Sequence, residues 1–302
     1  MDLVALWGCV TSSSCLVTQG SAGLIAGFIL FLVAAGVTLI FGVLGFVNFV
    51  HGSFYMFGAY FAYTAYMVSG SYVIAVLAGM IGVGILGAVF EMTIVRQVYQ
   101  AEDLLQILVC YAFILIFDDV VRLIWGNEFL SMGMPEQFQL PPLFVLGGVV
   151  PPFYLVLIAV ALIIAVGVSL LMQRTRYGKI VRALALNRNM VAALGVNTRL
   201  VYVSVFALGA LLAGTGGALS APVRTMASGM GFSILIESFI VTVIGGMGSI
   251  MGALIASLLI GFVRSFGAVG FPMFTEGLIF LMMVAVLLLR PQGLLGRPIR
   301  EI

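Results

Sequence analysis

The sequence predicts an all-α protein, a polytopic transmembrane helical bundle of about nine spans (eight to ten), with interrupted helices among them. Of its 302 residues, 63% are hydrophobic and only 8% are charged, a balance typical of chains that fold in lipid. A helix needs roughly 20 apolar residues to cross a bilayer, and residues 153–172 contain no charged side chain. Similar apolar runs recur along nearly the whole length, so we expect residues 1–302 to form a single transmembrane domain.

The individual spans are predicted from apolar runs that end at polar or glycine-rich breaks. The candidate spans lie near residues 22–44, 52–69, 72–95, 104–124, 153–172, 201–220, 232–245, 249–267 and 271–289. Between the fourth and fifth of them, residues 126–152 contain two glutamates and five prolines but no basic residue. This composition predicts an external loop.

The basic residues predict the orientation, because short cytoplasmic loops of membrane proteins are enriched in lysine and arginine. Six of the thirteen basic residues lie in the loop 173–200, which we therefore place in the cytoplasm. Four further basic residues are separated from this loop by an even number of spans and therefore lie on the same side: Arg96, Arg290, Arg297 and Arg300. The N-terminus is then expected outside and the C-terminus inside. Arg122, Arg224 and Arg264 fall at outer span ends, where long side chains can reach the headgroups.

Glycine is frequent, with 37 residues, and in lipid small residues let helices approach closely. Most of these glycines are therefore expected at helix contacts. Two clusters, 42–60 and 245–252, differ because glycine there joins polar residues within an apolar run. Non-helical backbone at membrane depth is tolerated only where it is buried in protein or lines a water-filled cavity. These clusters, one in each half of the chain, predict the transport pathway.

Polar side chains within the apolar segments supply further pathway candidates. Asn48 and His51 could hydrogen-bond a polar solute or tie two helices together. Glu237 lies inside a short span, so it must pair, face water or be protonated; it is either a functional group or half of a buried ion pair. Glu91 and Glu276 lie nearer span ends, where we expect snorkelling or pairing. The candidate pathway residues are Asn48, His51, Tyr55, Glu237, Gly245, Gly246 and Gly248.

The sequence predicts no metal site and no catalytic site. His51 is the sole histidine, which excludes a histidine-based metal site, and the spans carry no nucleophile–base pair. Cys9, Cys15 and Cys110 lack metal-ligand spacing. We expect them to act as small buried hydrophobic residues, with a Cys9–Cys15 disulfide as the alternative. Neither enzymatic activity nor a cofactor is expected in this chain, and the net charge of +2 gives no reason to expect a nucleic-acid partner.

The chain carries no P-loop that could bind ATP. A Walker A loop requires G-x-x-x-x-G-K-[ST]. The only lysine, Lys179, has Gln173 where the first glycine should be and Ile180 where the hydroxyl should be. ATP-driven transport would therefore need partner subunits. The alternative is an ion-coupled carrier or a channel acting alone, with Glu237 as its proton site.

Residues 182–197, within the cytoplasmic loop, predict a short exposed helix. Asn187 or Asn189 can cap its N-terminus, Met190 begins a short apolar stretch that ends at Leu194, and Gly195 can end it in the left-handed conformation. Such a helix could enter a groove on a soluble partner, or it could lie on anionic headgroups. The residues alone leave both alternatives open.

Four separated motifs carry a resemblance to a known family. They are the loop 182–197, TLIFGVLGFVNFVHGSFYMFGAY at 38–60, VIGGMGSIMGALIASLLIG at 243–261 and RPQGLLGRP at 290–298. Together they resemble the membrane permease of branched-chain amino acid ABC importers, the Liv H-type subunit, over nearly the whole chain. The resemblance implies an ABC importer permease fold in the bacterial inner membrane. It also implies four kinds of partner: two cytoplasmic ATPases that bind ATP and Mg²⁺, a second, related permease subunit, a periplasmic solute-binding protein and the lipid bilayer.

The resemblance also implies a site and a solute. It identifies residues 183–197 as the coupling helix that rests on an ATPase. The candidate coupling residues are Arg182, Ala183, Asn187, Arg188, Met190, Leu194, Gly195 and Asn197. The implied solute is a branched-chain or other amino acid. This chain departs from the family pattern at Glu237, where many relatives carry lysine, and at Met251, where proline is usual, so urea and short amides stay alternative solutes.

Overall fold

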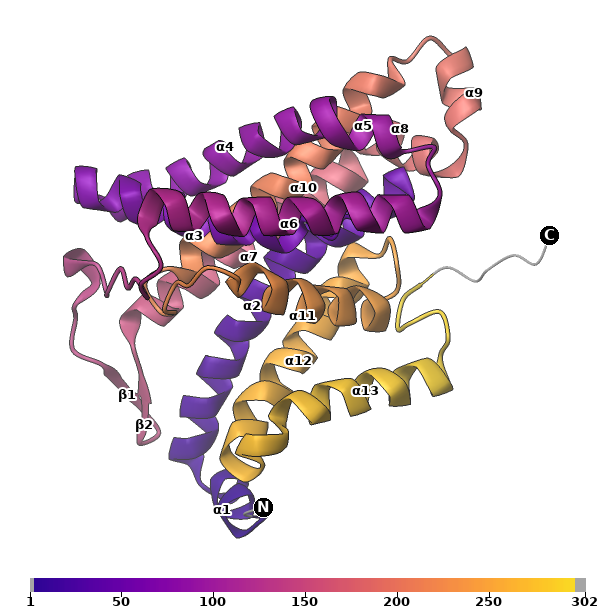
Figure 1. Ribbon diagram of the computed structural model, residues 1–302. Coiled ribbons are helices and arrows are strands. Elements are labelled where there is room, and N and C mark those ends of the chain that lie inside the picture. The colour runs from indigo at the N-terminus through magenta and orange to yellow at the C-terminus, as the bar shows by residue number, and fades with distance from the viewer. Residues whose placement is uncertain (1–2, 297–302) are drawn as a thin grey trace.

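The computed structural model describes residues 3–296, which are mostly helical and include one β-hairpin (Figure 1). The α-helices are α1 Leu3–Thr11, α2 Ser13–Leu44, α3 His51–Ser69, α4 Tyr72–Phe90, α5 Arg96–Val98, α6 Asp103–Trp125, α7 Pro152–Arg174, α8 Arg176–Leu186, α9 Arg188–Ala193, α10 Thr198–Ser220, α11 Met230–Gly245, α12 Ile250–Gly270 and α13 Thr275–Leu289. The other elements are the π-helical turn η1 Glu91–Val95, the 3-10 turns η2 Glu136–Phe138 and η3 Pro272–Phe274, and the strands β1 Leu143–Val145 and β2 Gly148–Val150. The predicted all-α polytopic class is confirmed.

Each of the nine predicted spans coincides with a helix, but the helices differ in length. Within residues 3–296, seven helical segments are long and apolar enough to cross a membrane. They are α2, α4 with its continuation to Val98, α6, α7, α10, α12 and η3 with α13. At 1.5 Å per residue the 16-residue α11 measures about 24 Å, which is shorter than the hydrocarbon core. The count of nine spans therefore stays a prediction, with α3 and α11 as the two additional segments.

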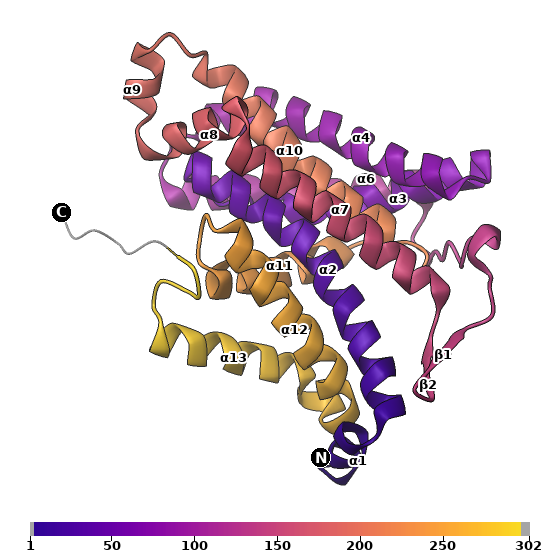
Figure 2. The same ribbon diagram turned by 180° about the vertical axis from the view of Figure 1, so that it is seen from behind.

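Helix α2 is the longest helix and joins two groups of helices. Figures 1 and 2 show it running diagonally from the N-terminal end of the molecule toward α8 and α9. On one side it packs against α10, which in turn packs against α3 and α4. On the other side it packs against α12, which contacts α11 and α13. Its 32 residues span about 48 Å, so it extends beyond the predicted segment 22–44 at its N-terminal end.

Glycines on α2 bring its backbone close to both groups. A Cβ atom at Gly27 would lie 2.9 Å from the Leu258 Cα of α12. A Cβ atom at Gly36 would lie 2.5 Å from the Gly209 carbonyl oxygen of α10 and 2.7 Å from the His51 ring. Real Cβ atoms do not approach other atoms so closely, so only glycine fits at these positions. The expectation that glycine serves helix packing is confirmed at these contacts.

The loop between α6 and α7 contains a structured hairpin that the sequence analysis did not predict. Strands β1 and β2 pair antiparallel, with Leu143 opposite Val150. The turn between them has positive φ at Leu146 (51°) and Gly147 (80°), as a two-residue type I′ hairpin turn requires. The hairpin is fixed to the start of α2, because the Val149 N–H donates to Thr18 Oγ1 at 3.1 Å.

Cys9 and Cys15 form a disulfide between α1 and α2. Their Cα atoms lie 5.1 Å apart across the junction at Ser12, within the range that a disulfide bridges. The expectation that both act as buried hydrophobic residues is therefore wrong, and the alternative is correct. Cys110 is a buried free thiol, as expected.

The two ends of the molecule carry different elements. Helices α5, α8 and α9 lie together at one end, with the C-terminal ends of α2 and α13 facing the same way (Figure 1). The hairpin and the C-terminal end of α3 lie toward the opposite end (Figure 2). Arg96 and the basic residues of the 173–200 loop therefore share one end. Arg297 and Arg300, and the end of the 290–298 motif, lie outside the described residues.

The glycine contacts make a stability prediction. A Cβ atom at Gly217 of α10 would overlap the Tyr55 carbonyl oxygen of α3, whereas one at Gly167 of α7 meets no atom within 4 Å. We expect Gly217→Ala to lower the thermal unfolding midpoint of the purified protein, because overpacking typically costs about 1–3 kcal/mol. Gly167→Ala is the matched control and should unfold like the wild type. Equal midpoints for both variants would contradict the packing described here.

Candidate functional site

The break between α2 and α3 positions Asn48 and His51. Helix α2 ends at Leu44, and Gly45 caps it with a left-handed φ of 64° while donating its N–H to the Phe41 carbonyl. The chain then runs without helix to Val50. Within this segment the Asn48 Oδ1 atom accepts a hydrogen bond from the Val50 N–H at 3.1 Å. The break predicted for the 42–60 cluster therefore lies at residues 45–50.

Asn48 and His51 are both buried and both tied to the backbone. The His51 Nε2 atom lies 3.1 Å from the Val33 carbonyl oxygen, so the ring links α3 to α2. One polar atom remains on each side chain, because Asn48 Nδ2 and His51 Nδ1 have no hydrogen-bond partner among the described residues. The helix-tying role weighed for these residues is thus present for His51.

The second glycine cluster forms the turn between α11 and α12. Gly246 and Gly248 have positive φ angles of 96° and 82°, which favour glycine. The Ser249 side chain caps α12 by accepting the Gly252 N–H at 3.0 Å. A Cβ atom at Gly42 would lie 2.9 Å from the Gly248 Cα atom. The structure therefore brings the two glycine clusters together, although about 200 residues separate them in sequence.

The C-terminal segment closes over the same turn. The Leu294 N–H donates to the Ile244 carbonyl at 2.7 Å, and the Leu295 N–H donates to the Gly245 carbonyl at 3.1 Å. A side chain at Gly246 would collide with the backbone of Gly296. Two of the motifs that carry the family resemblance, 243–261 and 290–298, are therefore direct neighbours.

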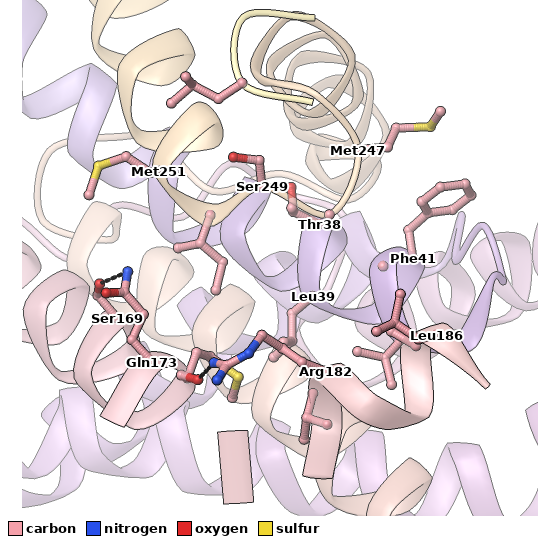
Figure 3. Close-up of a pocket in the computed structure, with 18 residues that line it drawn as sticks. Thr38, Leu39, Phe41, Ser169, Gln173, Arg182, Leu186, Met247, Ser249 and Met251 are labelled. Atoms are coloured by element: carbon pink, nitrogen blue, oxygen red, sulfur yellow. Dashed lines mark hydrogen bonds between the residues drawn. The ribbon is translucent and has the colours of Figure 1, made fainter. Parts of the chain in front are cut away.

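A pocket of about 540 Å³ opens beside this turn (Figure 3). It lies among the C-terminal third of α2, the end of α7, α8 and the α11–α12 turn. Its polar lining residues are Thr38, Ser169, Gln173, Arg182 and Ser249. The remaining lining is mostly apolar and includes Leu39 and Met251. The pocket therefore offers apolar walls with a few polar groups, which is typical of sites for small amphipathic molecules.

Arg182 belongs to this pocket as well as to the predicted coupling loop. Its guanidinium donates a hydrogen bond to the Met172 carbonyl at the end of α7. Figure 3 shows Arg182 reaching from α8 toward the side of the pocket that Gln173 lines. Gly248, a predicted pathway residue, lines the same pocket. The pocket therefore brings together one predicted coupling residue, Arg182, and one predicted pathway residue, Gly248. Tyr55 and Glu237 do not line it.

Tyr55 lies at the contact between α3 and α10. Its hydroxyl donates to Ser220 Oγ at 2.7 Å, and its side chain is buried. Arg224 lies in the connection between α10 and α11. Its pKa is raised, mainly by the neighbouring Tyr55 hydroxyl and to a smaller extent by the carboxylates of Glu237 and Glu276. Tyr55 and Glu237 therefore share the electrostatic neighbourhood of Arg224.

Glu237 is half of a buried ion pair. Its Oε2 atom lies 2.6 Å from Arg264 Nη1, and its side chain is only 8% exposed. Arg264 also contacts Glu276 at 3.2 Å, so it connects α11, α12 and α13. Arg264 was expected at an outer span end, and its side chain is 30% exposed and bonded to both a buried and an exposed carboxylate. The sequence contained a signal for this pair, since both charges lie inside apolar runs that cannot leave them unpaired.

The loop 173–200 contains two helices, not one coupling helix over 183–197. Helix α8 includes Arg182 and Ala183 and ends at Leu186. Asn187 then caps α9, because its Oδ1 atom accepts the Met190 N–H at 3.0 Å. A single helix over 183–197 does not form, because this cap requires an extended backbone at Asn187, which interrupts the helix. Asn187 is therefore the N-cap, and Asn189 is not.

The end of α9 follows the sequence prediction. Gly195 has a φ of 83° and stops the helix in the left-handed region. Asn197 caps the following helix α10 by accepting the Leu200 N–H at 3.3 Å. Met190 and Leu194 are 66% and 78% exposed, and the Arg188 guanidinium stacks 5.1 Å above the Tyr202 ring. Met190 of α9 and Leu194 directly after it are thus exposed apolar side chains. The contact of Arg188 with Tyr202 holds α9 against α10.

The ion pair makes a prediction about stability. Removing one partner of a buried pair typically costs about 3–5 kcal/mol, because it leaves the other charge uncompensated. We expect Arg264→Gln to lower the thermal unfolding midpoint strongly, and Glu276→Gln, at the exposed side of the network, to lower it little. Adding Glu237→Gln to Arg264→Gln should recover most of the loss. A double variant that unfolds at the same temperature as Arg264→Gln would show that the pair is not what holds these helices.

Comparisons with known proteins give the same family that the four motifs resemble. Residues 21–287 match the family model of the branched-chain amino acid transport system / permease component. The chain is 31% identical over 293 residues to the high-affinity branched-chain amino acid transport system permease protein BraD of Pseudomonas aeruginosa, covering 91% of this chain and 94% of that protein. It is 27% identical over 284 residues to the permease protein LivH of Escherichia coli, covering 88% and 91% of the two chains.

A more distant relative is the probable branched-chain amino acid transport permease protein LivH of Methanocaldococcus jannaschii, 24% identical over 289 residues and covering 89% of each chain. No solved structure matches the chain significantly. The family match covers most of the sequence and includes both glycine clusters and the α8–α9 region. The chain belongs to the family of branched-chain amino acid transport permease components.

Proposed function

We propose that this permease passes a branched-chain amino acid, or another small amino acid, across the bacterial inner membrane as one subunit of an ABC importer. The relatives named above are described as permeases for branched-chain amino acids. The observation that carries the proposal is α9, a capped helix that exposes Met190 and Leu194 at the end of the molecule rich in basic residues. Exposed apolar residues on a projecting helix favour a groove on a protein partner.

The partner at α9 would be a cytoplasmic ATPase, with two such subunits in the complex. The chain has no P-loop of its own, so ATP and Mg²⁺ would be bound by these subunits. A second, related permease subunit and a periplasmic solute-binding protein would complete the importer. This permease would contribute the path and its gating, and it would need no cofactor of its own.

The pocket in Figure 3 supports a route for the solute. Its mixed lining suits a zwitterion with an aliphatic side chain, because polar groups such as Thr38 and Ser249 alternate with apolar walls. It lies between the α11–α12 turn and α8, so a movement of the docking region would change its shape. We propose this pocket as the inner part of the pathway, with Asn48 and His51 deeper in the protein. Glu237, Tyr55 and Arg224 would lie toward the outer side.

The proposed orientation places the N-terminus outside and the C-terminus inside. Arg96 and the basic residues of loop 173–200 support it, since they share one end of the molecule. The Cys9–Cys15 disulfide also supports it, because disulfides persist in oxidising compartments such as the periplasm. Helix α1, which carries Cys9, packs against the C-terminal end of α12, where a Cβ atom at Gly270 would meet the Leu6 side chain.

The ion pair of Glu237 argues against a carrier that works alone. A transported ion would need free access to this carboxylate, but Glu237 is buried and its Oε2 atom is already engaged by Arg264 at 2.6 Å. Urea or a short amide stays the alternative solute of the same importer type. Transport assays with leucine, urea and acetamide in competition would distinguish these solutes.

The orientation can be tested by labelling. Cysteine introduced by Asn189→Cys should react with a membrane-impermeant maleimide only after cells are permeabilised, whereas Leu146→Cys in the hairpin should react in intact cells. Native background should be low, because Cys9 and Cys15 are paired and Cys110 is buried. Labelling of residue 189 in intact cells would overturn the proposed orientation and the ATPase docking role together.

The docking role can be tested by binding. We expect Leu194→Asp to weaken association with the ATPase at least about tenfold, since burying a leucine side chain is worth roughly 1.5–3 kcal/mol. Leu146→Asp is the matched control, with a similar exposed fraction at the opposite end. Both variants should fold, and association is measured in detergent by surface plasmon resonance. Unchanged binding by Leu194→Asp would exclude α9 as the docking element.

A further inference from the structure

A buried carboxylate with two hydrogen-bond donors lies where α4 ends. The Glu91 side chain is only 1% exposed. Its Oε2 atom accepts from Arg96 Nη2 at 3.1 Å, and its Oε1 atom accepts from the Tyr99 hydroxyl at 3.1 Å. Both donors follow the π-helical turn η1, which begins at Glu91.

The π-helical turn explains how these residues meet. In a regular α-helix, residues five apart are rotated by about 140° around the axis and face different sides. The wider turn η1 reduces this rotation, so Arg96 returns to the side of Glu91. The backbone irregularity therefore builds the network, and such turns occur often at functional positions.

Tyr99 connects this network to α9. Its ring packs edge to face against Tyr202 of α10, with centroids 5.6 Å apart. Tyr202 in turn contacts Arg188, the first residue of α9, whose guanidinium lies 5.1 Å from the centre of the Tyr202 ring. Tyr202 also packs with Leu184 and Val191 in a small hydrophobic cluster apart from the main core. Helices α8 and α9 are therefore seated on the Tyr99–Tyr202 pair.

Tyr99 also connects to the broken segment 45–50. The ring of Phe46 lies 6.0 Å from that of Tyr99, at an interplanar angle of 87°. Phe46 is buried and lies two residues before Asn48. The same tyrosine thus touches the support of the docking helix and the break that positions Asn48 and His51. Burial, with the neighbouring Glu91 carboxylate, raises the pKa of Tyr99, so the hydroxyl stays a hydrogen-bond donor at physiological pH.

We propose that Tyr99, oriented by Glu91, is a positioning residue that couples movement of α9 to the broken segment 45–50. This proposal rests on the docking role of α9 given above. Movement of α9 would be transmitted through Arg188 and Tyr202 to Tyr99, and from Tyr99 to Phe46. The Tyr99 ring contacts both Phe46 and Tyr202. Glu91 keeps the ring in this position, because its carboxylate accepts the hydrogen bond of the Tyr99 hydroxyl.

The first test uses the full-length permease alone, in lipid nanodiscs, and needs no ATPase. Spin labels at Asn189→Cys in α9 and Gln97→Cys in α5 report the distance between the docking helix and its support. Tyr99→Phe and Tyr202→Leu should broaden this distance distribution, because each removes one link of the network. Tyr202→Phe keeps the ring and should match the wild type, as should Tyr111→Phe on the exposed side of α6. Unchanged distributions for Tyr99→Phe and Tyr202→Leu would overturn the proposal.

The second test measures leucine delivered per ATP hydrolysed by the complete importer in proteoliposomes. We expect Tyr99→Phe to lower this ratio by about tenfold, equivalent to roughly 1.4 kcal/mol, while its ATPase association stays normal. Glu91→Gln keeps an acceptor for the Tyr99 hydroxyl and should retain most of the coupling. A wild-type ratio for Tyr99→Phe would overturn the coupling role.

The two tests separate this proposal from the proposed function. Failure of the wild-type complex to deliver leucine, or failure of α9 to bind an ATPase, would count against the function. The spin-label distances would still decide whether Tyr99 positions α9. Tyr99→Phe retains the ring and its packing, so it decides the question even if Tyr202→Leu fails to fold.

Discussion

Close backbone contact between helices is the constraint on which the rest of this structure depends. In lipid, apolar side chains gain little by leaving one apolar environment for another, so helices associate through packing and polar contacts. Glycines on α2 therefore face α12 at Gly27 and α10 at Gly36. The same requirement acts between α3 and α10, where Gly58 and Gly214 meet. The long helix α2 can hold two groups of helices together only because its own backbone is accessible to both.

The buried polar groups follow from the same environment. The two buried carboxylates of the described residues each have a cationic partner, as Glu91 has Arg96 and Glu237 has Arg264. An unpaired charge at these positions would be costly, since no water compensates it. These pairs also connect elements, because Arg264 joins three helices and Glu91 fixes Tyr99. Asn48 Nδ2 and His51 Nδ1 differ, as each lacks a partner among the described residues next to the broken helix.

The elements proposed for function are contiguous at one end of the molecule. The docking helix α9, the pocket beside Gly248, the C-terminal segment and the end of α2 all meet there. Such an arrangement lets a partner that moves α9 act on the pathway over a short distance. The opposite end carries the hairpin and, on the N-terminal side, the disulfide, both of which stiffen the connections near the start of α2. The fold is thus anchored at one end and has its candidate moving parts at the other.

The sequence by itself determined the features that depend on local chemistry. The apolar runs predicted the all-α class and the helices. Asn187 was one of two predicted N-caps of α9 and Gly195 its predicted end, because caps and left-handed turns involve residues close in sequence. Only the tertiary structure decided which distant groups meet. It paired Glu237 with Arg264, placed Gly42 against Gly248, joined Cys9 to Cys15 and seated Tyr202 on Tyr99. Apolar periodicity cannot specify such pairs, because in lipid every face of a helix can be apolar and the partner is chosen by the packing of whole helices.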